Sequence, residues 1–201
     1  MSLSIVLVRH GETAWSITGQ HTGRTDLPLT ERGERESGRL EARLRGASFM
    51  RVLTSPLQRA RRTCELAGFG AVATVEPELA EWSYGQYEGR RTAEIRQARP
   101  GWDLFRDGCP GGEALEDVRA RADRLVLDIR QGAGDVLLFA HRDILRILAV
   151  RWAGLPAEAA QALEFSPACL GTLGFERGSS RPVILHWNDD RHLEAGEADG
   201  R

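Results

Sequence analysis

The apolar positions of this chain of 201 residues form short runs, and most of these runs are separated by stretches in which apolar and charged residues follow each other with helical spacing. Short runs rich in Val, Ile and Leu with polar residues on either side are typical of buried strands. The predicted strands are residues 3–8, 50–54, 71–75, 136–140, 171–175 and 182–187. We expect the last two to form an antiparallel pair that closes the sheet.

Two helices are predicted from their capping residues. Thr30 is a suitable N-cap for a charged helix over residues 31–45. Ser55 followed by Pro56 predicts a cap with proline at the first helical position, for a helix that extends to about residue 66.

Two later helices are predicted from apolar spacing, from Glu113 onwards and over residues 144–152, and the second is expected to be largely buried. Because strands alternate with helices, the sequence predicts a three-layer α/β/α sandwich around a mostly parallel central sheet with an antiparallel edge strand. In such sheets ligands bind beyond the carboxyl ends of the strands. We expect a single domain over residues 1–192 and a flexible tail at 193–201.

Composition narrows the class of protein. The chain is 41% hydrophobic and 28% charged, with a net charge of −2 and with acidic and basic residues interspersed, which gives no indication of a nucleic-acid partner. No apolar run is long enough to cross a membrane, and the N-terminal residues lack the features of a signal peptide. Three widely spaced cysteines fit neither a disulfide framework nor a zinc site, so we expect a cytoplasmic protein.

Two of the predicted strands lead directly into a histidine. The first is followed by Arg9 and His10, and the fourth by His141. A neutral imidazole nitrogen is a nucleophile, and a neighbouring guanidinium disfavours the charged imidazolium. A phosphoryl group is a suitable target, since arginine binds its oxygens with paired donors. Taken alone, however, the Arg-His-Gly sequence also fits an ordinary polar exit from a strand.

Further motifs follow in a specific order. After RHGET (9–13) come SPLQRARRT (55–63), ELAEWSYGQYEG (78–89) and the histidine at the end of the fourth strand. With these motifs the chain resembles the histidine phosphatase superfamily, which includes the cofactor-dependent phosphoglycerate mutases. The segments GQHTGRTDLPLT (19–30) and WDLFRDGCPGGE (102–113) are similar to the sedoheptulose-bisphosphatase group within it.

The resemblance implies catalytic roles for five residues. It implies that His10 is the nucleophile and becomes phosphohistidine, and that Arg9, Arg59 and His141 bind the oxygens of the transferring group. It also implies that Glu81 protonates the leaving oxygen and then activates water, which requires a pKa raised by burial or by the incoming phosphate. No cofactor and no metal are implied, because two histidines without a third ligand make a poor metal site.

The resemblance also indicates residues that bind substrate. Thr13, Thr22 and Gly23 match the loop that lines the mouth of the pocket in this superfamily, although ordinary turn roles explain them equally well. Tyr84, together with Trp82, is expected to provide an apolar wall beside the catalytic carboxyl group.

Arg142 departs from the family pattern, which usually has glycine after the second histidine. Its side chain either turns outward to pair with an acid or contacts a second anionic group of the substrate. We favour the outward orientation, because a bulky side chain inside would narrow the pocket.

A second departure concerns the reaction. The mutases carry a lysine after the Tyr-Gly pair and two adjacent arginines in a later insert, whereas this chain has Thr92 and Arg106-Asp107. We therefore predict a metal-independent phosphomonoester hydrolase that acts on a small phosphorylated metabolite, such as a sugar phosphate or bisphosphate. The alternatives are a cofactor-dependent phosphoglycerate mutase and a non-catalytic protein that binds phosphorylated ligands. The sequence is compatible with a monomer and with a homodimer.

Overall fold

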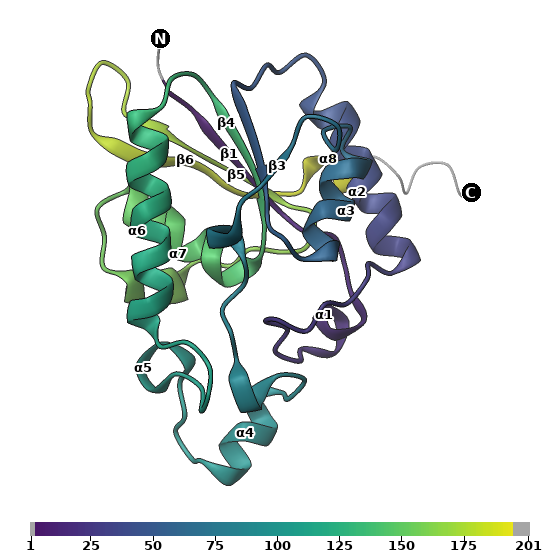
Figure 1. Cartoon of the computed structure of the whole chain (residues 1–201), viewed down its shortest axis with the longest axis vertical. Coiled ribbons are helices and arrows are strands. Elements are labelled where there is room, and N and C mark those ends of the chain that lie inside the picture. The colour runs from purple at the N-terminus through teal and green to yellow at the C-terminus, as the bar shows by residue number, and fades with distance from the viewer. Residues whose placement is uncertain (1–2, 195–201) are drawn as a thin grey trace.

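The computed structural model describes residues 3–194, which form a six-stranded sheet with helices on both faces (Figure 1). In their order across the sheet, the strands are β3 (Thr74–Val75), β2 (Arg51–Thr54), β4 (Val136–Ala140), β1 (Ile5–Arg9), β5 (Leu170–Phe175) and β6 (Pro182–Asp189). The first four are parallel to one another, whereas β5 pairs with β1 and β6 in antiparallel orientation. The predicted mostly parallel sheet with an antiparallel edge is confirmed.

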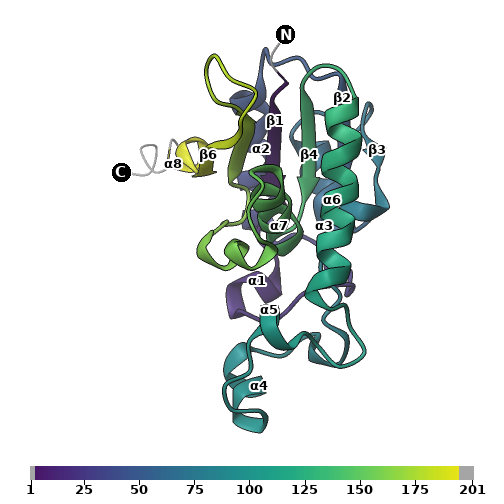
Figure 2. The same ribbon diagram turned by 90° about the vertical axis from the view of Figure 1, so that its left-hand side faces the viewer.

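The helices form the two outer layers of the sandwich (Figures 1 and 2). One face of the sheet carries α2 (Glu31–Leu44), α3 (Gln58–Leu66) and α8 (Arg191–Glu194), and the other carries α6 (Leu115–Gln131) and α7 (Arg142–Trp152). The connecting segments contain α1 (Ala14–Thr18), α4 (Thr92–Ala98), α5 (Leu104–Asp107) and the 3₁₀ helices η1 (Pro77–Leu79), η2 (Gly85–Tyr87) and η3 (Ala157–Ala162). The helices α1, α4 and α5 lie beyond the carboxyl ends of β1 and β4 (Figure 1).

The alternation of side chains along each strand divides the core in two. Leu7 and Leu138 belong to the apolar cluster on the side of α6 and α7. Their sequence neighbours Val8 and Phe139 belong to the cluster formed with α2 and α3. Both faces of the central strands are therefore buried, which explains why these strands are continuous apolar runs in the sequence.

Two predicted element boundaries are wrong. The helix expected to start at Pro56 starts at Gln58, with Leu57 as its N-cap, and Ser55 lies outside it. The third strand spans only Thr74–Val75, because the chain before it is held in a turn by the Val72 N–H, which donates to the Phe69 carbonyl at 3.1 Å.

The cap of α2 is confirmed, since the Thr30 Oγ1 accepts a hydrogen bond from the Gly33 N–H at 3.0 Å. The tail predicted for residues 193–201 falls mostly outside the described residues, and Leu193 and Glu194 complete α8. In the part of the chain that the structure describes, no helix is both long and apolar enough to cross a membrane.

Candidate active site

The parallel pairing of β1 with β4 brings two histidines together. Arg9 pairs with Ala140 at the ends of these strands, so the next residues, His10 and His141, leave the sheet side by side. The centroids of their rings are 5.1 Å apart, and both side chains are buried. The convergence predicted from the two strand ends is thus present at the carboxyl edge of the sheet.

The ring of His10 is held in one orientation by the backbone. Its Nδ1 lies 2.7 Å from the carbonyl oxygen of Gly11, which can only accept a hydrogen bond, so the proton is assigned to Nδ1. The lone pair of the neutral ring is then on Nε2. Burial, followed by the charges of Arg59 and Arg9, holds the pKa of His10 well below 6.5, which keeps the ring neutral at pH 7.

The second histidine contacts an arginine and a serine. The Arg59 Nε donates to the His141 Nδ1 at 3.1 Å, so the proton of this ring is on Nε2, which lies 2.7 Å from the Ser55 Oγ. Burial and the charge of Arg59 also hold the pKa of His141 well below 6.5. Ser55, which was predicted only as a helix cap, is therefore part of the site. Its position directly after β2, at the same edge of the sheet as the histidines, is the signal that could have identified it.

Arg59 is fully buried and connects the histidines to the loop before α2. Its Nη1 donates to the carbonyl of Thr25 at 2.9 Å, and its Nη2 donates to the carbonyls of Thr22 and Gly23 at 3.1 and 2.9 Å. The same loop is held from the other side by Glu88, whose carboxylate accepts the backbone N–H groups of residues 23–25. Thr22 and Gly23 are thereby attached to the site through their backbone.

Glu81 lies at the N-terminus of α7, where unpaired backbone N–H groups point towards it. Its Oε1 accepts from the N–H groups of Trp82 and Ile144 at 2.9 and 3.1 Å, and its Oε2 accepts from the N–H of Asp143 at 3.1 Å. Burial, together with the nearby charge of Asp143, nevertheless raises the pKa of Glu81 to about 7. A carboxyl group with this pKa can both donate and accept a proton near neutral pH.

The charge of Asp143 is stabilised by its own partners. The Tyr84 hydroxyl donates to its Oδ2 at 2.6 Å, and the Arg146 Nη1 lies 2.8 Å from its Oδ1. Burial opposes ionisation of this carboxyl, but Arg146 and Arg142 outweigh burial and lower its pKa. Tyr84 therefore presents its hydroxyl to Asp143 rather than acting only as the apolar wall that was predicted. Asp143 was missed, although it follows His141 by two positions.

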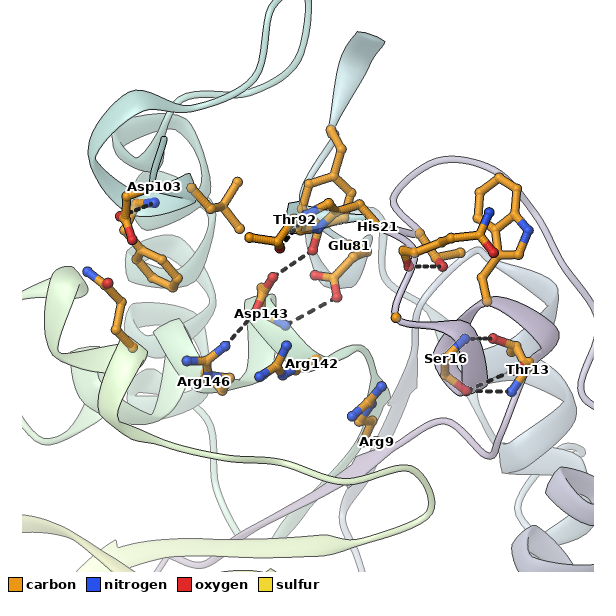
Figure 3. A pocket seen from close by; sticks show the side chains of 18 of the residues that line it. Arg9, Thr13, Ser16, His21, Glu81, Thr92, Asp103, Arg142, Asp143 and Arg146 are labelled. Atoms are coloured by element: carbon orange, nitrogen blue, oxygen red, sulfur yellow. Dashed lines mark hydrogen bonds and ion pairs between the residues drawn. The ribbon is translucent and has the colours of Figure 1, made fainter. Parts of the chain in front are cut away.

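A pocket of about 330 Å³ opens at this edge of the sheet. Of the residues predicted from the sequence, its lining includes His10, Arg9, Glu81, Thr13, Thr22, Tyr84 and Arg142. Figure 3 shows Glu81, Asp143 and three arginines near its centre and Thr13, the N-cap of α1, at one side. Of the predicted site residues, Arg59, His141 and Gly23 are not in the lining; Arg59 and His141 are fully buried and in contact with each other.

The other lining residues include His21, Trp102 and Asp103 from the segments 19–30 and 102–113, and Thr92 and Arg96, which lie outside those segments. These side chains come from the loop before α2 and from the long connection between η2 and α6. No short-range pattern in the sequence indicated that these segments meet over the histidines.

Thr13, Arg9 and Arg142, which line the pocket, have further contacts. Thr13 is buried and caps α1, since its Oγ1 accepts from the Ser16 N–H at 3.2 Å. Arg9 donates through Nη1 to the Phe165 carbonyl, and burial and the charge of Arg142 lower its pKa to about 10. Arg142 forms an ion pair with Glu164 at 2.8 Å, so the predicted pairing with an acid is confirmed, and its side chain also borders the pocket.

Comparison with known proteins agrees with this arrangement. The family model of the histidine phosphatase superfamily (branch 1) matches residues 5–190. An acid phosphatase from Mycobacterium tuberculosis is 38% identical over 186 residues, which cover 90% of this chain and 91% of that protein. A sedoheptulose 1,7-bisphosphatase from Saccharomyces cerevisiae is 36% identical over 182 residues, covering 75% of this chain and 67% of that protein.

A relative from Cronobacter sakazakii that is named as a phosphoglycerate mutase is 31% identical over 211 residues, covering 98% of each chain. Among solved structures, that of a functionally characterised open reading frame from Mycobacterium tuberculosis has a TM-score of 0.87 and 35% identity, covering 92% of this chain and 97% of that one. The motifs, the fold and these matches over most of the chain agree, and the chain is a member of the histidine phosphatase superfamily.

Proposed function

We propose that this phosphatase hydrolyses phosphate monoesters of small metabolites through a phosphohistidine on His10, without a metal ion. The proposal rests on two groups that line the same pocket. One is the neutral imidazole of His10, whose Nε2 carries the lone pair, and the other is the carboxyl group of Glu81, whose pKa is about 7. Phosphoryl transfer needs little more than such positioning and stabilisation of charge.

The two steps use the same residues. In the first, the Nε2 of His10 forms a bond to phosphorus, the bond from phosphorus to the ester oxygen breaks, and protonated Glu81 gives its proton to the leaving alcohol. In the second, ionised Glu81 removes a proton from water, the water oxygen bonds to phosphorus and the N–P bond breaks. Phosphate leaves, and both residues return to their starting states.

The neighbouring cations suit the charge of the transferring group. We assign its non-bridging oxygens to Arg9, to the positive charge of Arg59 and to His141, whose neutral ring carries a proton on Nε2. Thr13, Thr22 and Tyr84 line the pocket, which supports a role for them in substrate binding. Gly23 supports the site through its backbone, and a side chain at this position would not fit. A Cβ added there would lie 2.2 Å from the Glu88 Oε1 and 2.3 Å from the Trp82 carbonyl oxygen.

Substitution of the nucleophile tests the proposal. His10→Ala is expected to abolish release of phosphate from p-nitrophenyl phosphate, whereas EDTA leaves the wild-type rate unchanged. Brief reaction with a phosphate-labelled substrate, followed by alkaline quenching, is expected to leave label on the wild-type protein and none on His10→Ala. Turnover that survives this substitution would refute the proposal.

A mutase activity is the second candidate, and the similarity to the relative named as a mutase favours it. Against it, Arg106 is exposed and forms an ion pair with Asp107 at 2.7 Å rather than lining the pocket, and Thr92 stands where the mutases carry lysine. Interconversion of 3- and 2-phosphoglycerate that depends on a bisphosphate primer and exceeds phosphate release would support the mutase. Binding of phosphate esters with neither reaction would support a non-catalytic protein.

A sugar phosphate or bisphosphate is the substrate class we propose, because a sedoheptulose bisphosphatase is among the relatives. We also propose a cytoplasmic location, because Cys64, Cys109 and Cys169 are buried as free thiols. Assays of a panel of phosphorylated metabolites would rank the substrates.

A further inference from the structure

Arg142 is a cation at the start of a helix and close to another cation of the pocket. It is the first residue of α7, and the N-terminus of a helix carries a partial positive charge. It also lies close enough to Arg9 for its charge to lower the pKa of that residue. Burial also disfavours its charge, but the charges of Asp143 and Glu164 outweigh burial and raise the pKa of Arg142. The cation at this position therefore depends on its anionic neighbours.

The guanidinium of Arg142 is only partly engaged by the protein. Its Nη2 contacts the Glu164 carboxylate at 2.8 Å, and its Nε has no hydrogen-bond partner among residues 3–194. Both side chains of this ion pair are accessible, with 42% of Arg142 and 64% of Glu164 exposed. An ion pair in contact with solvent contributes little to stability, so another anion can replace Glu164 without a large penalty.

Arg146, which also lines the pocket, is more fully bonded to the protein than Arg142. Arg146 is buried, and it is held by Asp143 through Nη1 and by the Ala160 carbonyl through Nε at 2.8 Å. Arg142 therefore retains donors that the protein does not use, whereas Arg146 has a structural partner on two sides. Figure 3 shows Arg142 between Arg146 and Arg9.

The size of the pocket leaves room for more than the transferring group. A volume of about 330 Å³ falls in the range of sites that hold whole small molecules. A phosphate held by His10 and Arg9 fills only part of this space, which Arg142 also lines.

We propose that Arg142 selects phosphate esters that carry a second anionic group, a carboxylate or a further phosphate, and that this group replaces the Glu164 carboxylate on its guanidinium. The inference rests on the proposed function, because it requires the first phosphate to bind at His10. A forked guanidinium suits both kinds of anion, since each offers two oxygens in one plane.

Two matched ligands test the inference. Glycerol 3-phosphate and 3-phosphoglycerate share the phosphate and the three-carbon length, but the second carries a carboxylate in place of the hydroxymethyl group. Each is assayed as a competitive inhibitor of p-nitrophenyl phosphate hydrolysis, so that the readout does not require either compound to be turned over. The wild-type inhibition constant is expected to be about tenfold lower for 3-phosphoglycerate, as expected for one charge-assisted contact.

Variants then test whether Arg142 causes the preference for 3-phosphoglycerate. Arg142→Gln is expected to bring the ratio of the two inhibition constants close to one, and Arg142→Lys to retain part of it. Glu164→Gln removes the competing carboxylate and is expected to improve binding of 3-phosphoglycerate alone. Arg181→Gln is the control, because Arg181 is exposed, is paired with Glu176 and lies outside the pocket.

The outcomes separate the inference from the proposed function. Equal inhibition by both ligands in the wild type, or a ratio that Arg142→Gln leaves unchanged, would overturn the role of Arg142 while hydrolysis through His10 stands. Weaker binding of 3-phosphoglycerate to Glu164→Gln would contradict the replacement of Glu164. Hydrolysis by His10→Ala would instead overturn the proposed function itself.

Discussion

Two neighbouring carboxyl groups in the pocket have pKa values that are shifted in opposite directions. Asp143 has Arg146 and the Tyr84 hydroxyl as partners and stays ionised. Burial and the charge of Asp143 raise the pKa of Glu81 to about 7, although the backbone N–H groups that it accepts favour its ionised form. When the pKa values of two neighbouring groups are shifted apart, the groups can take separate roles. The raised pKa assigns proton transfer to Glu81.

The activity of the wild type is expected to fall above pH 7 as Glu81 loses the proton that it must donate. Glu81→Gln is expected to lower kcat/KM for an alkyl phosphate by about 10²- to 10⁴-fold and to remove this alkaline decline. The loss is expected to be smaller for p-nitrophenyl phosphate, whose leaving group needs little protonation. Profiles of kcat/KM from pH 5 to 9 measure both effects, and an unchanged alkaline decline in Glu81→Gln would assign it to another group.

The same pKa predicts how stability depends on pH. The pKa of Glu81 rises from 4.5 to about 7 on folding, so the folded state binds the proton more tightly and loses stability as the pH rises through this window. Between pH 4 and pH 8 this amounts to about 3 kcal/mol. The opposing effects of His10 and His141 are present in wild type and variant alike. Glu81→Gln is therefore expected to gain stability relative to wild type as the pH rises, measured by urea unfolding, and a constant difference would contradict the raised pKa.

At the scale of single residues, the sequence was most informative where a residue follows a strand directly. His10, Arg9 and His141 could be placed because parallel strands end at one edge. Ser55 follows β2 in the same way, but its proline neighbour favoured a helix cap. Asp143 could not be assigned, because its effect on Glu81 arises from a contact between residues 62 positions apart in the chain.

At the level of elements, the loop after β1 is packed directly against α2. A Cβ added at Gly11 would lie 2.6 Å from the Gly33 carbonyl oxygen, and one added at Gly33 would lie 2.2 Å from the Glu12 carbonyl oxygen. The Thr30 N–H also donates to the Glu12 carbonyl at 2.9 Å. The helix therefore fixes the backbone that sets the ring of His10.

Two glycines of α2 provide a matched pair for testing this packing. Gly33→Ala is expected to displace the Glu12 backbone and to reduce both the melting temperature and kcat. Gly38→Ala, in the same helix with no atom within 4 Å of an added Cβ, is expected to stabilise the protein by about 1 kcal/mol and to leave kcat unchanged. Thermal unfolding and steady-state kinetics measure the melting temperature and kcat of both variants. Equal behaviour of the two variants would show that the loop does not depend on close contact with α2.

Elements were predicted best where a single local signal determined them. The buried runs of β1 and β4 and the Thr30 cap of α2 were found with nearly correct bounds. Errors occurred where signals conflicted: the Ser-Pro pair favoured an earlier start of α3, and the apolar residues before β3 form a turn. The connection over residues 76–113 forms much of the pocket through contacts with distant segments, which periodicity in the sequence does not reveal.

At the scale of the whole molecule, the pocket is an exception to the charge balance of the chain. The protein carries a net charge of −2, yet Arg9 and Arg59 lie close to two buried histidines and, together with burial, keep them neutral. The lowered pKa values of Arg9 and Arg59 indicate that burial disfavours these charges. A bound anion therefore compensates for part of the cost of burying these two charges.

Inorganic phosphate is therefore expected to stabilise the folded protein. A ligand that binds only the folded state adds about 2.7 kcal/mol at a hundred times its dissociation constant, which corresponds to a rise in Tm of about 5–10 °C for a chain of this size. Arg9→Met is expected to lose most of this rise, because it removes the guanidinium next to His10, while sodium chloride at equal ionic strength leaves the Tm of both proteins nearly unchanged. Scanning calorimetry with and without phosphate measures the shifts. If Arg9→Met and wild type respond equally to phosphate, the anion binds elsewhere, and the concentration of positive charge at the sheet edge has another cause.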